Sequence, residues 1–449
     1  MPASPFRSSF AGQARLFLRC CALGGWLSLA GFARAQSWNL SWSDEFNGAA
    51  GSAIDATKWQ FEYGDLKVND ELEWYCGPPG DPRNQQPCGS NPGNASNAYI
   101  DGNGHLVIQA FRITSATAPG SKAWTSTRMN TANHPASFQY GRIEASVKLP
   151  VGPGIWPAFW ALGTNIDAVD WPNSGEIDFM EDVPASGGLG PSIVKSTIHG
   201  PTYSGGNGIG QDFKFPLKGA TGPDVTSFHT YGAIWSPSML QFYVDDPANV
   251  FFVRTASDVP GGASQWAFNH PFFLILNLAI GGANSWPGPP DATTPSPALM
   301  LVDYVRVYTP AAIAAPTMTA TPIHLATDGS ASGMVTLTAP GETGGRHTSG
   351  GGGIVYLECT GAPAGASCTI DSGNPLSSAV VDLRHTNSGR ATIRLARQDA
   401  SGAALPSSGA PLPSSSASAV ESYQLTVTAH TVSGDSSTVR VRVSSGNRP

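Results

Sequence analysis

Apolar and polar residues alternate along many short stretches of this chain. In YGRIEASVKL, the residues Ile143, Ala145, Val147 and Leu149 fall on one face of an extended strand, and charged or polar residues fall on the other. Similar stretches are FHTYGAIWS, LQFYVDD, PFFLILNLAIGG and LVDYVRVY, bounded by Gly, Pro, Asp or Asn. No long stretch follows the 3.6-residue period of a helix. The pattern predicts an all-β antiparallel sandwich with one sheet face free to carry a groove.

The density of aromatic residues falls sharply near residue 310. Beyond residue 318 the only aromatic residues are Tyr356 and Tyr423, yet short alternating stretches such as GMVTLTAP, ATIRLAR and STVRVRVS continue. We therefore predict a larger β-sandwich over residues 36–309, a linker at 310–317, and a smaller β-sandwich over 318–449.

Composition supports strands joined by many turns, in more than one domain. The chain has 449 residues, which is too long for one ordinary core, and it contains 52 Gly and 37 Pro. Residues 1–35 have a basic start, a short apolar segment and ARAQ at a cleavage position. We expect them to be a signal peptide, and the mature protein to be secreted.

Net charge narrows the set of partners. The formal charge is −7, and removal of residues 1–35 takes away four arginines and lowers it to −11. An acidic chain is a poor partner for nucleic acid or for an anionic membrane. No apolar segment outside residues 1–35 is long enough to span a bilayer. We expect a monomer with neither kind of partner.

Four cysteines remain after the expected cleavage. Cys76 and Cys88 lie in one loop, and Cys359 and Cys368 lie in one hairpin-like segment. Local pairing is the simplest of the three possible connectivities, and an exported protein permits it. A metal site is the alternative, but no histidines cluster near either pair.

The stretch GEIDFMED places carboxylates in what otherwise reads as a buried strand. Glu176 and Asp178 share one strand face, but the odd spacing from Glu176 turns Glu181 toward the core. An unpaired carboxylate there costs several kcal/mol, or it loses its charge. A β-bulge at Phe179–Met180 would return Glu181 to the face of the other two acids and leave the apolar pair in the core.

Such a row has the spacing that sugar hydrolysis needs. About four strand steps separate the two glutamates, and side chains leaning inward bring their carboxyls to roughly 5 Å. A retaining glycosidase needs two carboxyls at about that distance, one as nucleophile and one as acid/base. Solvated strand acids are the alternative interpretation. Trp156, Trp160 and Trp171 favour the catalytic one, because aromatic faces suit sugar rings.

Nine motifs occur in the order typical of one enzyme family: SWSDEFNG, YGRIEASVKLP, GIWPAFWALG, WPNSGEIDFMED, STIHG, FHTYGAIWS, FYVDD, LILNLAIGG and VDYVRVY. Over residues 38–308 the chain resembles the laminarinase-like enzymes of glycoside hydrolase family 16. The resemblance implies a β-jelly-roll, a glucan-binding cleft on its concave sheet, and retaining endo-hydrolysis of β-1,3-linked glucans. The lichenase branch of that family has a shorter E-x-D-x-E motif without the bulge.

The resemblance assigns roles to the three acids. Glu176 would be the nucleophile, Glu181 the general acid/base, and Asp178 a hydrogen-bonding partner of the nucleophile. Since three neighbouring carboxyls do not all ionise readily, we expect Glu181 to keep its proton to higher pH.

The family pattern also implies a set of substrate-binding residues: Trp156, Trp160, Trp171, His199, Arg128, Asn277 and Glu71, the last beside Glu73 and Tyr75 in a cleft-edge loop. A structural histidine, strand–strand polar contacts and, for Trp156, a place in the core are the alternatives. The loop CGPPGDPRNQQPCGSNPGN is longer than in the family, which leaves the shape of one cleft end open.

Catalysis by two carboxyls needs no cofactor, but many family members carry a structural calcium away from the active site. The matching ligands are the backbone carbonyls of Glu45 and Gly104 and the side chain of Asp303. Oxygen ligands suit calcium, although Asp303 could simply end a strand.

The C-terminal part resembles immunoglobulin-like modules of secreted bacterial proteins, over residues 318–446. Its lack of tryptophan favours a spacer or stabilising role over carbohydrate binding.

The sequence thus predicts a secreted endo-β-1,3-glucanase, with mixed-linkage β-1,3-1,4-glucan as a further substrate and transglycosylation as a further reaction. The alternatives are a non-catalytic glucan-recognition protein and a hydrolase of agarose or carrageenan. All three acids are present, which disfavours the non-catalytic recognition protein. The small number of basic residues disfavours a sulfated substrate.

Overall fold

The computed structural model describes residues 38–85, 87–113, 122–133, 137–183, 192–215, 225–311, 315–325, 331–338, 354–362, 366–383, 388–397, 422–431 and 436–445. The expected signal peptide lies outside the described residues. Within the described ranges, no helix is long and apolar enough to cross a membrane.

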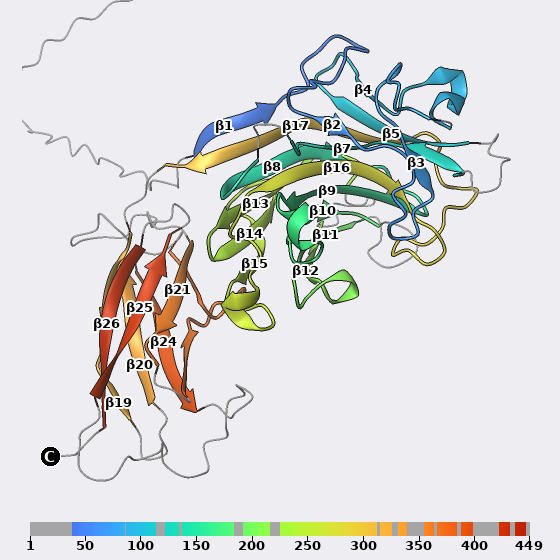
Figure 1. Ribbon diagram of the computed structural model, residues 1–449. Coiled ribbons are helices and arrows are strands. Elements are labelled where there is room, and N and C mark those ends of the chain that lie inside the picture. The colour runs from blue at the N-terminus through green and yellow to red at the C-terminus, as the bar shows by residue number, and fades with distance from the viewer. Residues whose placement is uncertain are drawn as a thin grey trace, which may run out of the picture. The chain divides into compact units, whose positions relative to one another are not determined.

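Two antiparallel sheets account for most of residues 38–310 (Figure 1). A ten-stranded sheet contains β1 (Trp38–Asp44), β3 (Glu73–Tyr75), β4 (Ala98–Ile100), β5 (Leu106–Arg112), β6 (Trp124–Ser126), β8 (Gly141–Lys148), β13 (His229–Ser236), β14 (Met239–Val244), β15 (Val250–Thr255) and β17 (Ala298–Pro310). Its pairs are antiparallel apart from the short parallel pair β3–β6.

A seven-stranded sheet faces it, in the order β12-β11-β10-β9-β16-β7-β2. Its strands are β2 (Gln60–Phe61), β7 (Arg128–Asn130), β9 (Ile155–Gly163), β10 (Glu176–Glu181), β11 (Ile193–His199), β12 (Ile209–Lys214) and β16 (Phe272–Ile280). The helical segments among the described residues are short: α1 (Ile166–Val169) and 3-10 turns at Cys88–Ser90, Pro92–Asn94, Gly205–Asn207 and Gly262–Gln265.

The core of this sandwich lies between the two sheets. It is one apolar cluster that includes residues of β8, β13 and β17 from one sheet and of β9, β10 and β16 from the other. All nine residues of β16 are buried, which fits its near-continuous apolar sequence and its central place in the sheet. The predicted all-β class is confirmed.

The alternation in β8 is also confirmed, but its polar face is not open to water. Ile143, Ala145 and Val147 are buried in the core cluster. On the other face Glu144 is only 5% exposed, and the hydroxyls of Tyr243 and Tyr308 both donate to its carboxylate. Hydrogen bonding to two donors stabilises a charge that burial alone would destabilise.

Strand β17 brings together three segments that are far apart in the sequence. It pairs with β1, β5 and β8, and Trp38 at the start of β1 is the register partner of Pro310 at the end of β17. The first and last strands of the sandwich are therefore neighbours in one sheet.

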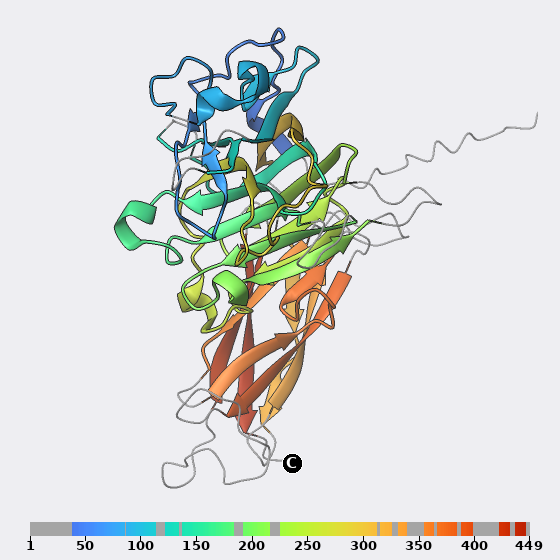
Figure 2. The same cartoon turned by 90° about the vertical axis from the view of Figure 1, so that its right-hand side faces the viewer.

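The C-terminal strands form two further sheets around their own apolar cluster (Figures 1 and 2). One has the order β18 (Thr317–Ala320), β20 (Ala331–Thr338), β24 (Ser388–Arg397) and β22 (Ala366–Asp371). The other has β19 (Ile323–Leu325), β26 (Ser436–Ser445), β25 (Ser422–His430), β21 (Ile354–Thr360) and β23 (Val380–Asp382). Two sheets with a shared core are what the alternating stretches predicted.

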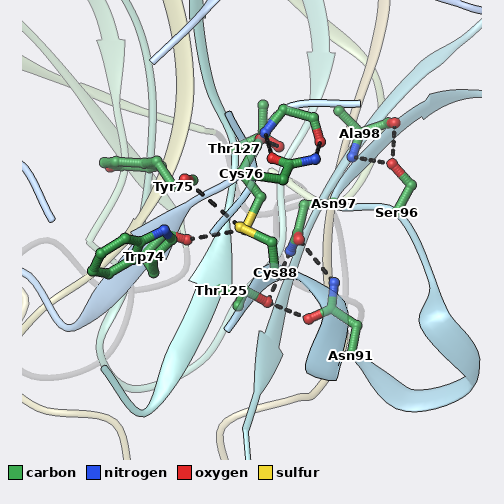
Figure 3. The surroundings of a disulfide bond; sticks show 12 residues. Trp74, Tyr75, Cys76, Cys88, Asn91, Ser96, Asn97, Ala98, Thr125 and Thr127 are labelled. Atoms are coloured by element: carbon green, nitrogen blue, oxygen red, sulfur yellow. Dashed lines mark hydrogen bonds between the residues drawn. A yellow bond between two sulfur atoms is a disulfide. The ribbon is translucent and has the colours of Figure 1, made fainter. Parts of the chain in front are cut away.

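Both local disulfides are present, Cys76–Cys88 and Cys359–Cys368. Figure 3 shows the first, beside a polar cluster in which Asn91 donates to Asn97 (2.8 Å) and accepts from Thr125 (2.5 Å). The hydroxyl of Thr127 donates to the carbonyl of Cys76 (2.9 Å). The long loop is thus tied to the strands that precede and follow it.

Replacing both cysteines of this loop by serine is expected to lower the free energy of unfolding by about 2–3 kcal/mol. The physical reason is conformational entropy: the disulfide closes the loop between Cys76 and Cys88 in the unfolded chain, and without the bond the unfolded chain gains the freedom that closure removes. Chemical denaturation of C76S/C88S against the unchanged protein measures it. An unchanged midpoint would show that the bond adds no stability.

Candidate active site

The central acidic motif forms strand β10, and this strand contains a β-bulge. Asp178 pairs with Trp160 and Met180 with the next residue, Phe159, so Phe179 has no partner of its own on β9. On β11 the register also shifts between Asp178 and Glu181. The predicted bulge at Phe179–Met180 is therefore confirmed.

The bulge sends its two apolar side chains into the core and turns Glu181 to the other face. Phe179 and Met180 are 2% and 0% exposed, and Phe179 stacks on Phe159 at a centroid distance of 4.7 Å. The hydroxyl of Ser196 donates to the carbonyl of Phe179 (2.8 Å). Because that bond comes from the neighbouring strand, it holds the irregular backbone in place.

Glu176, Asp178 and Glu181 line one cavity. The indole N–H of Trp171 donates to Glu176 Oε2 (2.6 Å), and that of Trp156 donates to Glu181 Oε1 (3.1 Å). The two outer carboxyls are thus each oriented by a tryptophan, as their roles would require.

His199 closes the row from strand β11, where it is the register partner of Glu176. Its Nε2 lies 3.2 Å from Asp178 Oδ2 and 3.7 Å from Glu176 Oε1. One ring nitrogen therefore faces two carboxyls. The structure places His199 beside the row, and its predicted contact with substrate stays a prediction.

Burial and the closeness of the carboxyls to one another raise the pKa values of all three acids in the row. Burial raises the pKa of Glu176 to about 8, with a further contribution from Asp178. Burial, followed by Glu176, raises the pKa of Glu181 to about 7. The pKa of Asp178 is also raised well above its usual range, first by burial and then by Glu181. The row holds protons at neutral pH that free carboxyls would release.

The two glutamates are shifted in the same direction. Burial and a neighbouring carboxyl raise the pKa of both, and His199 lowers the pKa of both. The expectation that Glu181 keeps its proton to higher pH than Glu176 therefore stays a prediction. A bound sugar changes both surroundings, and a coupled set of carboxyls titrates as one group.

These pKa shifts predict that Glu181→Gln stabilises the protein at pH 8. In the unfolded chain Glu181 ionises near 4.5, and in the folded chain near 7. The folded protein therefore becomes less stable as pH rises from about 4.5 to 7, and this loss of stability persists above that range. Glutamine does not ionise, so the variant avoids the loss. We expect a gain of about 1–2 kcal/mol at pH 8 and none at pH 4, because the shift is shared among coupled groups.

Thermal unfolding at the two pH values tests this, with Glu358→Gln as the control, since Glu358 has an exposed side chain on β21. Equal midpoints for E181Q and the unchanged protein at pH 8 would contradict the prediction.

A connected set of polar groups forms the floor of the cavity next to the row. Trp160 donates to Asn277 Oδ1 (2.8 Å), Asn277 donates to the hydroxyl of Tyr75 (3.2 Å), and Tyr75 donates to Glu71 Oε2 (3.2 Å). Asn69 donates to the other oxygen of Glu71 (3.1 Å). Trp160, Asn277, Glu71 and Asn69 line the cavity. Asn277 therefore holds Trp160 in place at the floor of the cavity.

Glu73, beside Glu71, is a buried support. It is 2% exposed, accepts from the backbone N–H of Ile280 (2.7 Å), and its pKa is raised well above the usual range by burial and then by Glu71. It thereby anchors the cleft-edge loop to β16, while Glu71 faces the cavity.

Arg128 lines the cavity but is engaged by protein groups. Its Nε lies 2.9 Å from Glu62 Oε1, and its guanidinium lies 4.7 Å from the ring centroid of Trp160. The side chain therefore braces Trp160 from one side and presents only its remaining N–H groups to the cavity.

Three residues of the site were missed from sequence: Asn69, Glu62 and Trp286. Trp286 contacts Trp156 edge to face at a centroid distance of 5.9 Å. Asn69 has a positive φ of 51°, a backbone conformation that asparagine adopts more often than most residues. An asparagine ahead of the acidic loop was therefore the sequence signal for this position. Glu62 had none, because nothing in its surroundings marks the residue as the partner of Arg128.

Within the described residues, one acid/histidine group has ligand atoms within 4.8 Å of one another: Glu176, Asp178 and His199. We assign no metal to this group, because the three side chains already have partners in one another and in Trp171.

The strand register places the residues expected to bind calcium at one end of the sheet. Val302 pairs with Leu106 and Val305 with Asp44, which places Asp303 at the same end of the sheet as Gly104 and Glu45. Asp303 stands at an irregularity of β17 opposite β8. The carboxylate of Glu45 binds Arg306 (2.9 and 2.7 Å), so its backbone carbonyl is the atom left for a cation. The oxygen-only set fits calcium.

Comparison with known proteins agrees with this geometry. The family model described as glycosyl hydrolases family 16 matches residues 93–306. A beta-glucanase of Rhodothermus marinus is 33% identical over 282 residues, covering 61% of this chain and 86% of that protein. A keratan-sulfate endo-1,4-beta-galactosidase of Sphingobacterium multivorum is 34% identical over 275 residues, covering 60% of this chain and 55% of that one.

Among solved structures, the endo-beta-1,3-glucanase from Pyrococcus furiosus matches with a TM-score of 0.52 and 39% identity, covering 62% of this chain and 96% of that one. The predicted jelly-roll is confirmed by this likeness and by the two facing sheets. Through its bulged acidic strand, its sandwich and these relatives, the chain belongs to glycosyl hydrolases family 16.

Proposed function

We propose that this protein is a secreted, retaining endo-glycoside hydrolase that cleaves β-1,3-glucosidic bonds in laminarin-type or mixed-linkage β-glucans. The observation that carries the proposal is the bulge in β10, which places Glu176, Asp178 and Glu181 on one face of the cavity. A strand has no structural need for three acids on one face when one is buried and the other two are partly buried, since burying them raises the free energy of the fold.

The two outer carboxyls supply the chemistry. Glu176, ionised, attacks the anomeric carbon of the sugar while Glu181 protonates the departing glycosidic oxygen, so one C–O bond forms as another breaks. Glu181, now ionised, then takes a proton from water, whose oxygen displaces Glu176 and restores the original configuration. Asp178 and Trp171 contact Glu176 and hold it for attack.

Proton sharing within the row fits this cycle. The first step needs one proton on the pair, on Glu181, and the raised pKa values keep a proton on the pair at neutral pH. The partly exposed faces of Trp156, Trp160 and Trp171 give sugar rings a surface on which to pack.

The glucan preference is supported by the relatives and by the charge of the cavity. Its lining contains four carboxyls and one guanidinium, that of Arg128, which Glu62 already engages. A sulfated or carboxylated glycan would meet repulsion there. A galactan hydrolase remains the second candidate, because a keratan-sulfate galactosidase is as similar in sequence as the glucanase.

Product analysis tests the proposal. Purified protein would be incubated with laminarin, lichenan, curdlan and agarose, and reducing ends and product sizes followed over time. We expect shortening of laminarin with oligosaccharides from the first minutes, and β-configured products by NMR before mutarotation. Binding of laminarin without any reducing ends would instead support the glucan-recognition alternative.

We also propose a structural calcium held by the carbonyls of Glu45 and Gly104 and the carboxylate of Asp303, remote from the row. Calcium would stabilise this end of the sheet and take no part in hydrolysis. For the C-terminal module we propose an immunoglobulin-like spacer, supported by its two sheets around one core.

A further inference from the structure

A lysine stands opposite the residue proposed as acid/base. Lys195 on β11 is the register partner of Glu181 on β10, and directly opposite side chains in an antiparallel pair lie on the same face with Cβ atoms about 5 Å apart. Its neighbours on that face of β11 are Thr197 and His199. No role was assigned to Lys195 above.

A carboxylate on the next strand holds the lysine. Lys195 Nζ lies 3.3 Å from Asp212 Oδ1, and the two residues are register partners on β11 and β12. Both side chains are about one-third exposed, so the pair stands at the rim of the row with water on one side.

The backbone beside the lysine leaves room for its stem. A Cβ added to Gly210 on β12 would lie 2.7 Å from Lys195 Cε and 2.8 Å from Thr197 Oγ1. The end of the lysine side chain could move aside, but the backbone carbonyl of Ser196, 2.9 Å from the same Cβ, could not, so glycine is needed here. Gly210, Lys195 and Asp212 form one arrangement: an open backbone position, a lysine stem that crosses it, and an anionic partner at the end of the stem.

We propose that Lys195, held by Asp212, is a positioning residue that sets the charge of Glu181 during the glycosidase cycle. This inference rests on the proposed function, because the cycle gives Glu181 its alternating charge. When Glu181 protonates the leaving group it becomes anionic, and the ammonium opposite it stabilises that state. Asp212 limits the effect by neutralising part of the ammonium charge, so that Glu181 still holds its proton beforehand.

Other charges also face Glu181, and they set the background. Glu176 and Asp178 lie on the same strand, His199 and Lys195 on β11, and Asp212 on β12, while β9 contributes the neutral indole of Trp156. Burial and then Glu176 raise the pKa of Glu181, and His199, Trp156 and Lys195 lower it. Lys214, exposed and two residues beyond Asp212 on β12, is not among the groups that act on it.

The test uses two variants with opposite expected signs. Lys195→Met removes the positive charge and should raise the pKa of Glu181 by about half a unit to one unit. Asp212→Asn leaves the lysine uncompensated and should lower it. Lys195→Arg restores the charge and should return the value toward that of the unchanged protein. Lys214→Met is the matched control and should change nothing.

The pKa is read in the full-length protein by NMR of ¹³C-labelled glutamate carboxyls, with the signal of Glu181 identified by its loss in E181Q. The alkaline limb of kcat/KM on laminarin should move in the same direction for each variant. Shifts of the same sign in K195M and D212N, or none in K195M, would overturn the inference.

The two proposals fail separately. If the unchanged protein produces no reducing ends from any glucan, the proposed function fails, yet the NMR titration still decides whether Lys195 controls Glu181. If hydrolysis is found and the titration does not move, only the role of Lys195 falls.

Discussion

Glu176→Gln is expected to lower kcat on laminarin by at least about 1,000-fold while the fold is retained. Glutamine has nearly the shape of glutamate but cannot attack the anomeric carbon, so the covalent step is lost. It also keeps a group that can accept from the indole of Trp171 (2.6 Å in the unchanged protein). Initial rates, with circular dichroism to check folding, measure the effect.

A smaller variant separates the nucleophile from a merely supporting acid. Glu176→Gly leaves space beside the anomeric carbon, and added azide should restore turnover and give a glycosyl azide of inverted configuration. Glu358→Gln, on an exposed site of the C-terminal module, is the control and should keep full activity. Near-normal activity of E176Q would remove Glu176 from the proposed role.

Deleting one residue from the bulge should preserve the acidic row, whereas deleting one residue before it should destroy the row. Without Met180, the strand reads E-I-D-F-E, and regular alternation puts all three acids on one face. Without Ile177, the strand reads E-D-F-M-E. If the bulge is kept, Glu176 turns toward the core, and if the strand becomes regular, Asp178 does, so the row of three acids is lost in either case. We expect ΔMet180 to keep measurable hydrolysis and ΔIle177 to lose it entirely.

Both deletions remove a buried apolar side chain, and the loss of that side chain alone costs about 2–5 kcal/mol in either case. Assays at low temperature, with folding confirmed by circular dichroism, compare them. A folded ΔMet180 with no activity would show that the bulge does more than correct the alternation. Equal activity of the two deletions would contradict the mechanism altogether.

The bulge could be predicted because the sequence contained a conflict. Regular alternation would bury Glu181 beside an apolar pair, and one extra residue at that pair is the smallest change that removes the buried charge. The tryptophans next to the acids could be predicted for a similar reason: they lie within a few residues of β9 and β10 in sequence as well as in space.

Contacts between distant segments could not be predicted in this way. The strand order of the seven-stranded sheet must be known before two ion pairs can be inferred, that of Arg128 with Glu62 and that of Lys195 with Asp212. The sizes of the two glutamate pKa shifts could not be predicted for the same reason, since they depend on how far each carboxyl is buried and which neighbours face it.

The pairing of β1 with β17 has a consequence for the way this sandwich can be built. Residues 38–44 find their sheet partner only among residues 305–310, so the ten-stranded sheet closes after the whole stretch has been synthesised. The same pairing sets Trp38 and Pro310 side by side. A short linker could join them, and new ends could be opened in the loop after Val244, giving a circular permutant that keeps the acidic row intact.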